Sequence, residues 1–242
     1  MGGAVCDAVR AANDMELVCG IDPHRPRSTS PCTRRWRPRS SLGRPMCSST
    51  SPSLPSWPTT ARRRFRGSRL RGGPTGLSNE TLQELAALAP DGTCLFYAPN
   101  FTTGAVLMME FAKAAAPYFP EAEVIEFHHC NKKDAPSGTA VRTAQIIAEA
   151  RGGRASEAPG KETEIEGAEG ARGALVDGVP VHSVRSMGYV ASQEVIFGSL
   201  GQTLSIRHDS WDRTSYMPGV LLGIRSVGSC DGLVVGLENF MA

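Results

Sequence analysis

Residues 24–74 constrain the fold of this chain more than any other segment. They contain 13 Arg, 10 Ser and 8 Pro, but no Val, Ile, Asp, Glu or Lys. Strands favour β-branched residues, and each proline removes a backbone donor that a sheet or a helix requires. A segment of this composition also buries too little apolar surface to offset its conformational entropy. We therefore predict that residues 24–74 are disordered and supply neither a strand nor a helix.

This Arg/Ser/Pro block has three interpretations. The whole chain carries a net charge of +2, so the remaining 191 residues carry −11 and the block supplies all of the excess positive charge. The block can be a basic tail that binds nucleic acid or an anionic surface, or it can be a solvated linker. It can also result from a reading-frame shift in a GC-rich gene. We favour the frame shift and expect no nucleic-acid partner, because the block shows no helical or aromatic-interleaved pattern.

Outside the block, helical and strand patterns alternate. The apolar spacing predicts helices within 2–14, 78–88, 102–119, 138–151 and 216–227, and strands within 15–22, 93–99, 121–130, 231–237 and, at least three times, 178–210. This order predicts an α/β protein with an incomplete Rossmann-like nucleotide-binding domain and a mixed α/β domain inserted into it. We place the first domain at 1–99 and 209–242, and the second domain at 100–208.

Cysteine usage and hydropathy bear on where the protein functions. The seven Cys are odd in number, irregularly spaced and without a CxxC pair, which predicts reduced thiols rather than disulfides or a zinc site. No apolar run is long enough to span a bilayer. The first residues include Asp7 and no long apolar block, so they do not resemble a signal peptide. We expect a cytoplasmic protein with no membrane partner.

The stretch EFHHCNKKDAPSGTA, residues 126–140, concentrates chemistry that a packed core does not need. Its end precedes an amphipathic helix, which Asp134 or Ser137 can cap. The first amide groups of a helix have no internal partners and carry the positive end of its dipole. Gly138 has no Cβ, so a ligand can approach the backbone closely. The helix start is therefore a candidate binding site for a carboxylate or a phosphate.

His128, His129 and Lys132 precede this helix start. A histidine titrates near neutral pH and can donate or accept a proton, and a lysine adds a positive charge that holds a carboxylate or assists proton delivery. Taken alone, the two histidines can also be a hydrogen-bonded or surface pair at a strand end. We expect no metal, because no third ligand has a suitable spacing. Together these residues predict a site for a small dianionic substrate with acid–base assistance.

The same stretch closely resembles the signature of the bacterial dihydrodipicolinate (4-hydroxy-tetrahydrodipicolinate) reductase family. The segments PTGLS, FYAPNFTTGAVLMM and QEVIFGSLGQTLSIRHDSWDRTSYMPGVLLGIR are similar to that family in the same order. The resemblance extends over about residues 74–242 and faintly over 1–23. It implies reduction of the dihydrodipicolinate precursor with NADPH or NADH in the diaminopimelate route to lysine. It also implies that the second domain binds substrate and forms a homotetramer.

The resemblance assigns roles by position. His128 would be the general acid or base and Lys132 the proton donor, while His129, Gly138 and Thr139 would bind the carboxylates of the substrate. The cofactor contacts would be Asp22, Gly73, Thr75, Gly76, Ala98, Pro99, Asn100 and Phe101. Among these, Asp22 would face the ribose, and Ala98 to Phe101 would lie near the nicotinamide.

The chain also departs from the family pattern. The family's first strand and glycine-rich loop are missing before Met1, Pro74 stands where the family has Thr, and the Arg/Ser/Pro block replaces two middle strands. We therefore hypothesise that this chain keeps the substrate site but binds nicotinamide nucleotides poorly or not at all. The alternative to a reductase is then a catalytically impaired protein that only binds dicarboxylates or oligomerises.

Overall fold

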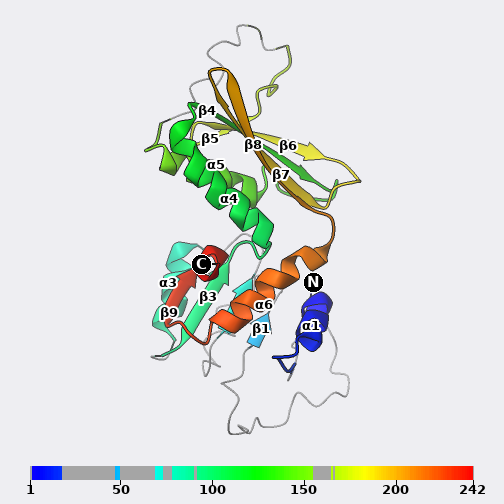
Figure 1. Ribbon diagram of the computed structural model, residues 1–242, viewed down its shortest axis with the longest axis vertical. Helices are drawn as coiled ribbons and strands as arrows, with labels where there is room; N and C mark the ends of the chain where they lie inside the picture. Colours follow the sequence, from blue (N-terminus) through cyan, green and yellow to red (C-terminus); the bar gives the residue numbers. More distant parts are fainter. Residues whose placement is uncertain are drawn as a thin grey trace. The chain divides into compact units, whose positions relative to one another are not determined.

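The computed structural model describes residues 2–17, 47–49, 69–72, 78–89, 92–154, 165 and 167–241, with only the backbone at Gly2, 47–49 and 69–72. The chain forms two compact units. One unit comprises Met1–Phe101 and Tyr216–Ala242, and the other comprises Thr102–Ser215. Both units combine helices with a sheet (Figure 1). The predicted α/β class is therefore confirmed.

The first unit is built on a parallel sheet in the order β1-β2-β3-β9. Its strands are β1 (Cys47–Ser49), β2 (Arg69–Gly72), β3 (Cys94–Ala98) and β9 (Gly232–Val235). Every residue of β3 is buried, as expected for a strand inside a parallel sheet. The helices of this unit are α1 (Gly2–Ala11), α3 (Asn79–Ala87) and α6 (Met217–Ser226), with a final 3₁₀ turn, η3 (Leu237–Phe240). An all-parallel sheet of this kind is consistent with the Rossmann-like prediction.

Strands β1 and β2 lie inside the Arg/Ser/Pro block, so the prediction that the block contains no strand is wrong at these positions. Leu70 of β2 lies in register with Phe96 of the buried strand β3, and Ser48 of β1 lies in register with Leu70. Backbone pairing does not require β-branched side chains, and a neighbouring strand can override weak intrinsic propensity. The rest of the block, and most of the predicted strand at 15–22, lie outside the described residues.

The prediction of reduced thiols is also wrong for one pair of cysteines. Cys94, at the start of β3, forms a disulfide with Cys230, which lies just before β9. The two residues are 136 positions apart in the sequence, but β3 and β9 are adjacent strands, so the sheet brings them together. Among the described side chains, Cys6 and Cys130 are free thiols. Sequence spacing alone could not reveal a pairing that strand order creates.

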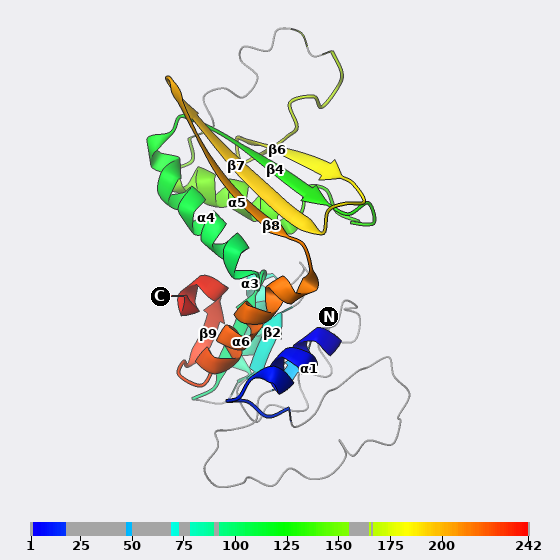
Figure 2. The ribbon, with the colours of Figure 1, turned by 45° about the vertical axis from the view of Figure 1, so that its right-hand side comes forward.

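The second unit is a five-stranded mixed sheet in the order β5-β6-β4-β7-β8. Its strands are β4 (Glu121–His128), β5 (Ala174–Val176), β6 (Val179–Arg185), β7 (Ala191–Ser199) and β8 (Gln202–Ser210). Strands β4 and β6 are parallel, and all other neighbours are antiparallel. Helices α4 (Thr103–Ala115) and α5 (Gly138–Ala150) cover one face of this sheet (Figures 1 and 2). The chain then continues from β8 into the 3₁₀ turn η2 (Arg213–Tyr216).

The core of the second unit lies between this sheet and its two helices. Val124 and Phe197 from the sheet and Ile147 from α5 are fully buried in one apolar cluster. Because side chains alternate along a strand, the residues of β4 that share the face of Val124 are Ala122, Glu126 and His128. Ala122 and Glu126 are buried. On this face of β4, Ala122 and Val124 therefore belong to the apolar core, whereas Glu126, nearer the end of the strand, is a buried charged residue.

The described part of the chain contains no helix that is both long and apolar enough to cross a membrane.

Candidate active site

The candidate site forms where β4 ends and α5 begins. Strand β4 ends at His128, a loop follows, and Ser137 caps α5 by accepting a hydrogen bond from the Ala140 amide at 3.2 Å. The sequence left Asp134 and Ser137 open as capping residues, and the structure selects Ser137. Gly138 and Thr139 therefore form the first residues of the helix, where the positive end of the helix dipole favours an anion.

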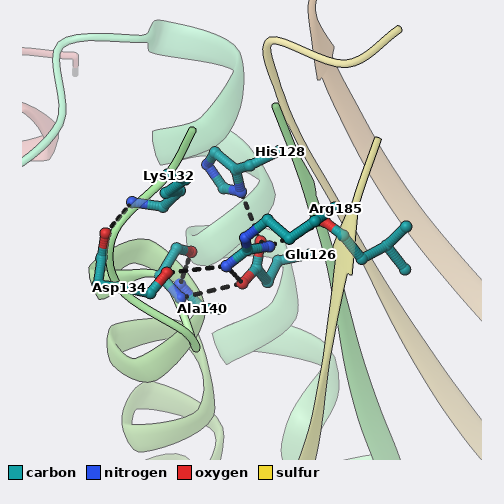
Figure 3. Close-up of polar contacts among 8 residues, drawn as sticks. Glu126, His128, Lys132, Asp134, Ala140 and Arg185 are labelled. Carbon is teal, nitrogen blue, oxygen red and sulfur yellow. Dashed lines mark hydrogen bonds and ion pairs between the residues drawn. The ribbon is translucent and has the colours of Figure 1, made fainter. Parts of the chain in front are cut away.

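A buried carboxylate connects the strand to this loop (Figure 3). The side chain of Glu126 is fully buried, and its Oε2 lies 2.5 Å from Nδ1 of His128. Arg185, at the end of β6, donates to both carboxylate oxygens, at 2.7 and 2.8 Å. The amide of Ser137 donates to Oε1 at 3.1 Å. Glu126 thus bonds to three segments at once: to His128 at the end of β4, to Arg185 of β6 and to Ser137, the capping residue of α5.

The environment of Glu126 keeps it ionised. Burial on its own would raise the pKa of Glu126, but hydrogen bonds from His128, Arg185 and Ser183 outweigh burial and lower that pKa from 4.5 to about 2. The hydrogen bond to Glu126 in turn raises the pKa of Arg185. An ionised carboxylate accepts hydrogen bonds but cannot donate them, so its partners must supply the protons.

Lys132 belongs to the same network through Asp134. Its Nζ donates to Oδ1 of Asp134 at 2.6 Å, and Arg185 donates to the backbone oxygen of Asp134 at 2.8 Å. Burial would raise the pKa of Asp134, but hydrogen bonds from Lys132 and from backbone amides, including that of Gly138, hold it below its ordinary value. Hydrogen bonds therefore link Lys132, Asp134, Arg185, Glu126 and His128 in series, with Lys132 on the side chain of Asp134 and Arg185 on its backbone.

The predicted substrate residues differ in burial and in whether they belong to this network. His128 and Lys132 are mostly buried, with side-chain exposures of 14% and 19%, and both belong to the network. Gly138 and Thr139 are half-buried at the start of α5, whereas His129 is exposed. The carbonyl of Thr139 accepts a hydrogen bond from Thr143, which also bonds to the buried Gln193 of β7. The first turn of α5 is thereby tied to the sheet.

The predicted cofactor residues fall into two groups. Ala98 is the last residue of β3 in the first unit, and Pro99, Asn100 and Phe101 follow it, at the strand end where ligands bind in open parallel sheets. The backbone around Phe101 is closely packed, because a Cβ at Gly219 of α6 would collide with the Phe101 carbonyl oxygen. Asp22, Gly73, Thr75 and Gly76 lie outside the described residues.

Sequence reasoning missed Glu126 and Arg185. Glu126 did carry a signal, since it occupies a core-facing position in the alternating pattern of β4, where a charged residue requires a partner. Arg185 carried no comparable signal, because it lies 59 residues further along the chain and reaches Glu126 only through the pairing of β4 with β6. Among the described residues, no group of three or more His, Cys, Asp or Glu side chains is placed to hold a metal ion.

Comparisons with known proteins identify relatives of this chain. A family model described as "Dihydrodipicolinate reductase, C-terminus" matches residues 104–241. The 4-hydroxy-tetrahydrodipicolinate reductase of Mycolicibacterium smegmatis is 55% identical over 171 residues, covering 70% of this chain and 69% of that protein. The protein of the same name from Nocardia farcinica is 46% identical over 250 residues, covering 100% of this chain and 94% of the relative.

A solved structure is also similar. It is the dipicolinate-bound dihydrodipicolinate reductase from Paenisporosarcina sp. TG-14, with 49% sequence identity and a TM-score of 0.60. The match covers 70% of this chain and 63% of the solved chain.

The α/β fold, together with these relatives, defines an oxidoreductase. The chain belongs to the 4-hydroxy-tetrahydrodipicolinate reductase family. The family prediction made from the sequence is confirmed, together with the oxidoreductase class and the role in lysine and diaminopimelate biosynthesis. The family uses a pyridine nucleotide as cofactor.

The low pKa of Glu126 predicts how stability depends on pH. The folded-state pKa lies below the ordinary value of 4.5, so this carboxylate contributes its full stabilisation above about pH 4.5 and loses it as the pH falls towards 2. We expect Glu126→Gln to abolish this part of the acid dependence, which amounts to roughly 3 kcal/mol. Urea unfolding of both proteins between pH 7 and pH 2 measures the difference.

The control is Glu149→Gln, which removes an exposed carboxylate paired with Arg142 near the end of α5. This variant should follow the wild-type acid dependence closely. An identical loss of stability on acidification in the wild type and in Glu126→Gln would contradict the assignment.

Proposed function

We propose that the loop and helix start between His128 and Thr139 form the substrate site for reduction of 4-hydroxy-tetrahydrodipicolinate to tetrahydrodipicolinate. The observation that carries this proposal is the hydrogen-bonded series from Lys132 to His128 beside the first amides of α5. It gathers two proton-bearing side chains and a helix start that favours anions. The dipicolinate bound to the solved relative supports a dicarboxylate as the ligand of this site.

Each predicted residue has a role that its position supports. The first turn of α5, at Gly138 and Thr139, attracts a substrate carboxylate through the positive end of the helix dipole, and Lys132 and His129 add charge and hydrogen-bond donors. His128 exchanges a proton with the substrate as general acid or base, and Lys132 is the proton donor. The bound nicotinamide supplies hydride, and these side chains hold the substrate and provide the accompanying proton.

We propose NADPH or NADH as the cofactor and the first unit as its binding domain. Strands β1 and β2 occupy positions where the sequence offered no strand, which weakens one ground for expecting impaired nucleotide binding. Ala98 to Phe101, at the carboxyl end of β3, are suited to contact the nucleotide. We further propose that the second unit binds the substrate and forms a homotetramer, and that the protein functions in the cytoplasm.

Substitution at the site tests the catalytic assignment. We expect His128→Asn and Lys132→Met each to reduce kcat by about 100-fold or more, because general acid–base assistance typically contributes 10²–10⁴-fold. The measurement is oxidation of NADPH or NADH with 4-hydroxy-tetrahydrodipicolinate, followed by absorbance, and calorimetric titration with dipicolinate in parallel. Weaker dipicolinate binding by Lys132→Met would support its contact with a carboxylate.

The matched control is His182→Asn. His182 also pairs with a glutamate, since its Nε2 lies 2.8 Å from Oε2 of Glu123, but Glu123 and Glu126 lie on opposite faces of β4. This variant should retain turnover. Wild-type kcat in both His128→Asn and Lys132→Met would refute the proposed site.

Nucleotide titration tests the cofactor assignment. We expect the purified chain to bind NADPH or NADH with micromolar affinity, measured by the change in nucleotide fluorescence, and the stronger ligand identifies the preferred cofactor. Absence of binding by both nucleotides, combined with retained dipicolinate binding, would instead favour a protein that only binds dicarboxylates.

A further inference from the structure

We propose that Glu126 and Arg185 act as a pair of positioning residues for His128: Glu126 fixes its proton on Nδ1, and Arg185 balances the charge of that carboxylate so that Nε2 stays free to gain and lose a proton. This inference rests on the proposed function only for the role of His128. The arrangement of the three side chains is itself independent of any substrate.

The tautomer follows from the contacts of Glu126. Its carboxylate is ionised, so it can only accept hydrogen bonds, and Nδ1 of His128 lies 2.5 Å from Oε2. Nδ1 must therefore carry a proton in every charge state of the ring. Figure 3 shows the second ring nitrogen on the side of the ring away from Glu126. Nε2 is thus the atom that can exchange a proton with a bound molecule.

Arg185 determines how much uncompensated negative charge Glu126 presents to the His128 ring. A buried carboxylate with no other partner would favour the protonated form of a neighbouring imidazole and would hold the ring in that form. Arg185 donates to both oxygens of Glu126, at 2.7 and 2.8 Å, and supplies one full opposite charge. The orientation of His128 is then fixed by the hydrogen bond, and the charge of the carboxylate is compensated by Arg185.

The other charged groups near the ring fit this balance. The loop contributes Lys132, which is paired with Asp134, and the exposed residues His129 and Lys133. The first turn of α5 contains no acidic residue. Within the described residues, the hydrogen bonds therefore place the Glu126 carboxylate against Nδ1 of His128 and the Arg185 guanidinium against that carboxylate. Removal of either charged group leaves the charge of the other uncompensated.

The opposite face of β4 carries a chemically similar trio that serves as a control. Glu123 pairs with His182 at 2.8 Å and with Arg172 at 2.5 Å. Its side chain is 32% exposed, whereas Glu126 is fully buried. Solvent screens charge changes at this more exposed trio, so they should have little effect on His128.

Long-range ¹H–¹⁵N spectra of the ¹⁵N-labelled full chain test the inference, because ring nitrogen shifts report both the tautomer and the titration midpoint of each histidine. The chain has five His, and the spectrum of His128→Asn assigns the signals of His128. In the wild type we expect the neutral ring to carry its proton on Nδ1. Glu126→Gln should lower the titration midpoint of His128 and mix its tautomers, and Arg185→Met should raise the midpoint, each by on the order of one pH unit.

Control variants and defined contrary outcomes keep the test decisive. Glu123→Gln and Arg172→Met should leave the midpoint of His128 within a few tenths of a unit, and Arg185→Lys, which keeps the charge, should move it less than Arg185→Met does. Midpoints that shift in the same direction in Glu126→Gln and Arg185→Met, or that do not shift, would overturn the proposal. A wild-type proton on Nε2 would overturn it without the Glu126 and Arg185 variants, even if those variants fail to fold.

These readouts do not depend on turnover. Full activity in His128→Asn would refute the proposed role of His128 in turnover and leave the tautomer result intact. Loss of activity in His128→Asn with unshifted midpoints in the Glu126 and Arg185 variants would refute only the positioning role.

Discussion

The ionised, fully buried carboxylate of Glu126 is the constraint around which the site is organised. A charge removed from water is tolerated only when opposite charges and hydrogen bonds compensate for the lost hydration. Arg185, His128 and the Ser137 amide supply that compensation from β6, from the end of β4 and from the cap of α5. The need to satisfy one carboxylate therefore fixes three separate segments in one arrangement.

The same contacts that stabilise the fold also set the shape of the candidate site. Because Arg185 also holds the backbone of Asp134, and Asp134 holds Lys132, the loop between β4 and α5 takes its shape from the same network. The helix start and the two proton-bearing side chains are preorganised in this way before any ligand binds. The apolar core beneath, with Val124 and Ile147, anchors the strand and the helix that carry them.

Local patterns in the sequence predicted the elements, but not the contacts between distant ones. Helix α5 could be recognised because its cap, Ser137, and its apolar spacing lie within one short stretch. Strand β2 could not be found, because Leu70 and its neighbours are held in a strand by pairing with β3 rather than by propensity. The disulfide between Cys94 and Cys230 and the pairing of Glu126 with Arg185 likewise arise from strand order. In the site, His128 and Lys132 were singled out from the sequence, whereas the supporting Glu126 and its partner Arg185 from β6 were not.

A double-mutant cycle on Glu126 and Arg185 tests the central claim most directly. The free energies of unfolding of the wild type, Glu126→Gln, Arg185→Met and the double variant give the coupling between the two side chains. If the buried carboxylate organises the site, Arg185→Met alone should cost about 3–5 kcal/mol, and the double variant should cost clearly less than the sum of the single variants. Additive losses would contradict the account, because they would show that the two side chains contribute to the fold independently of each other.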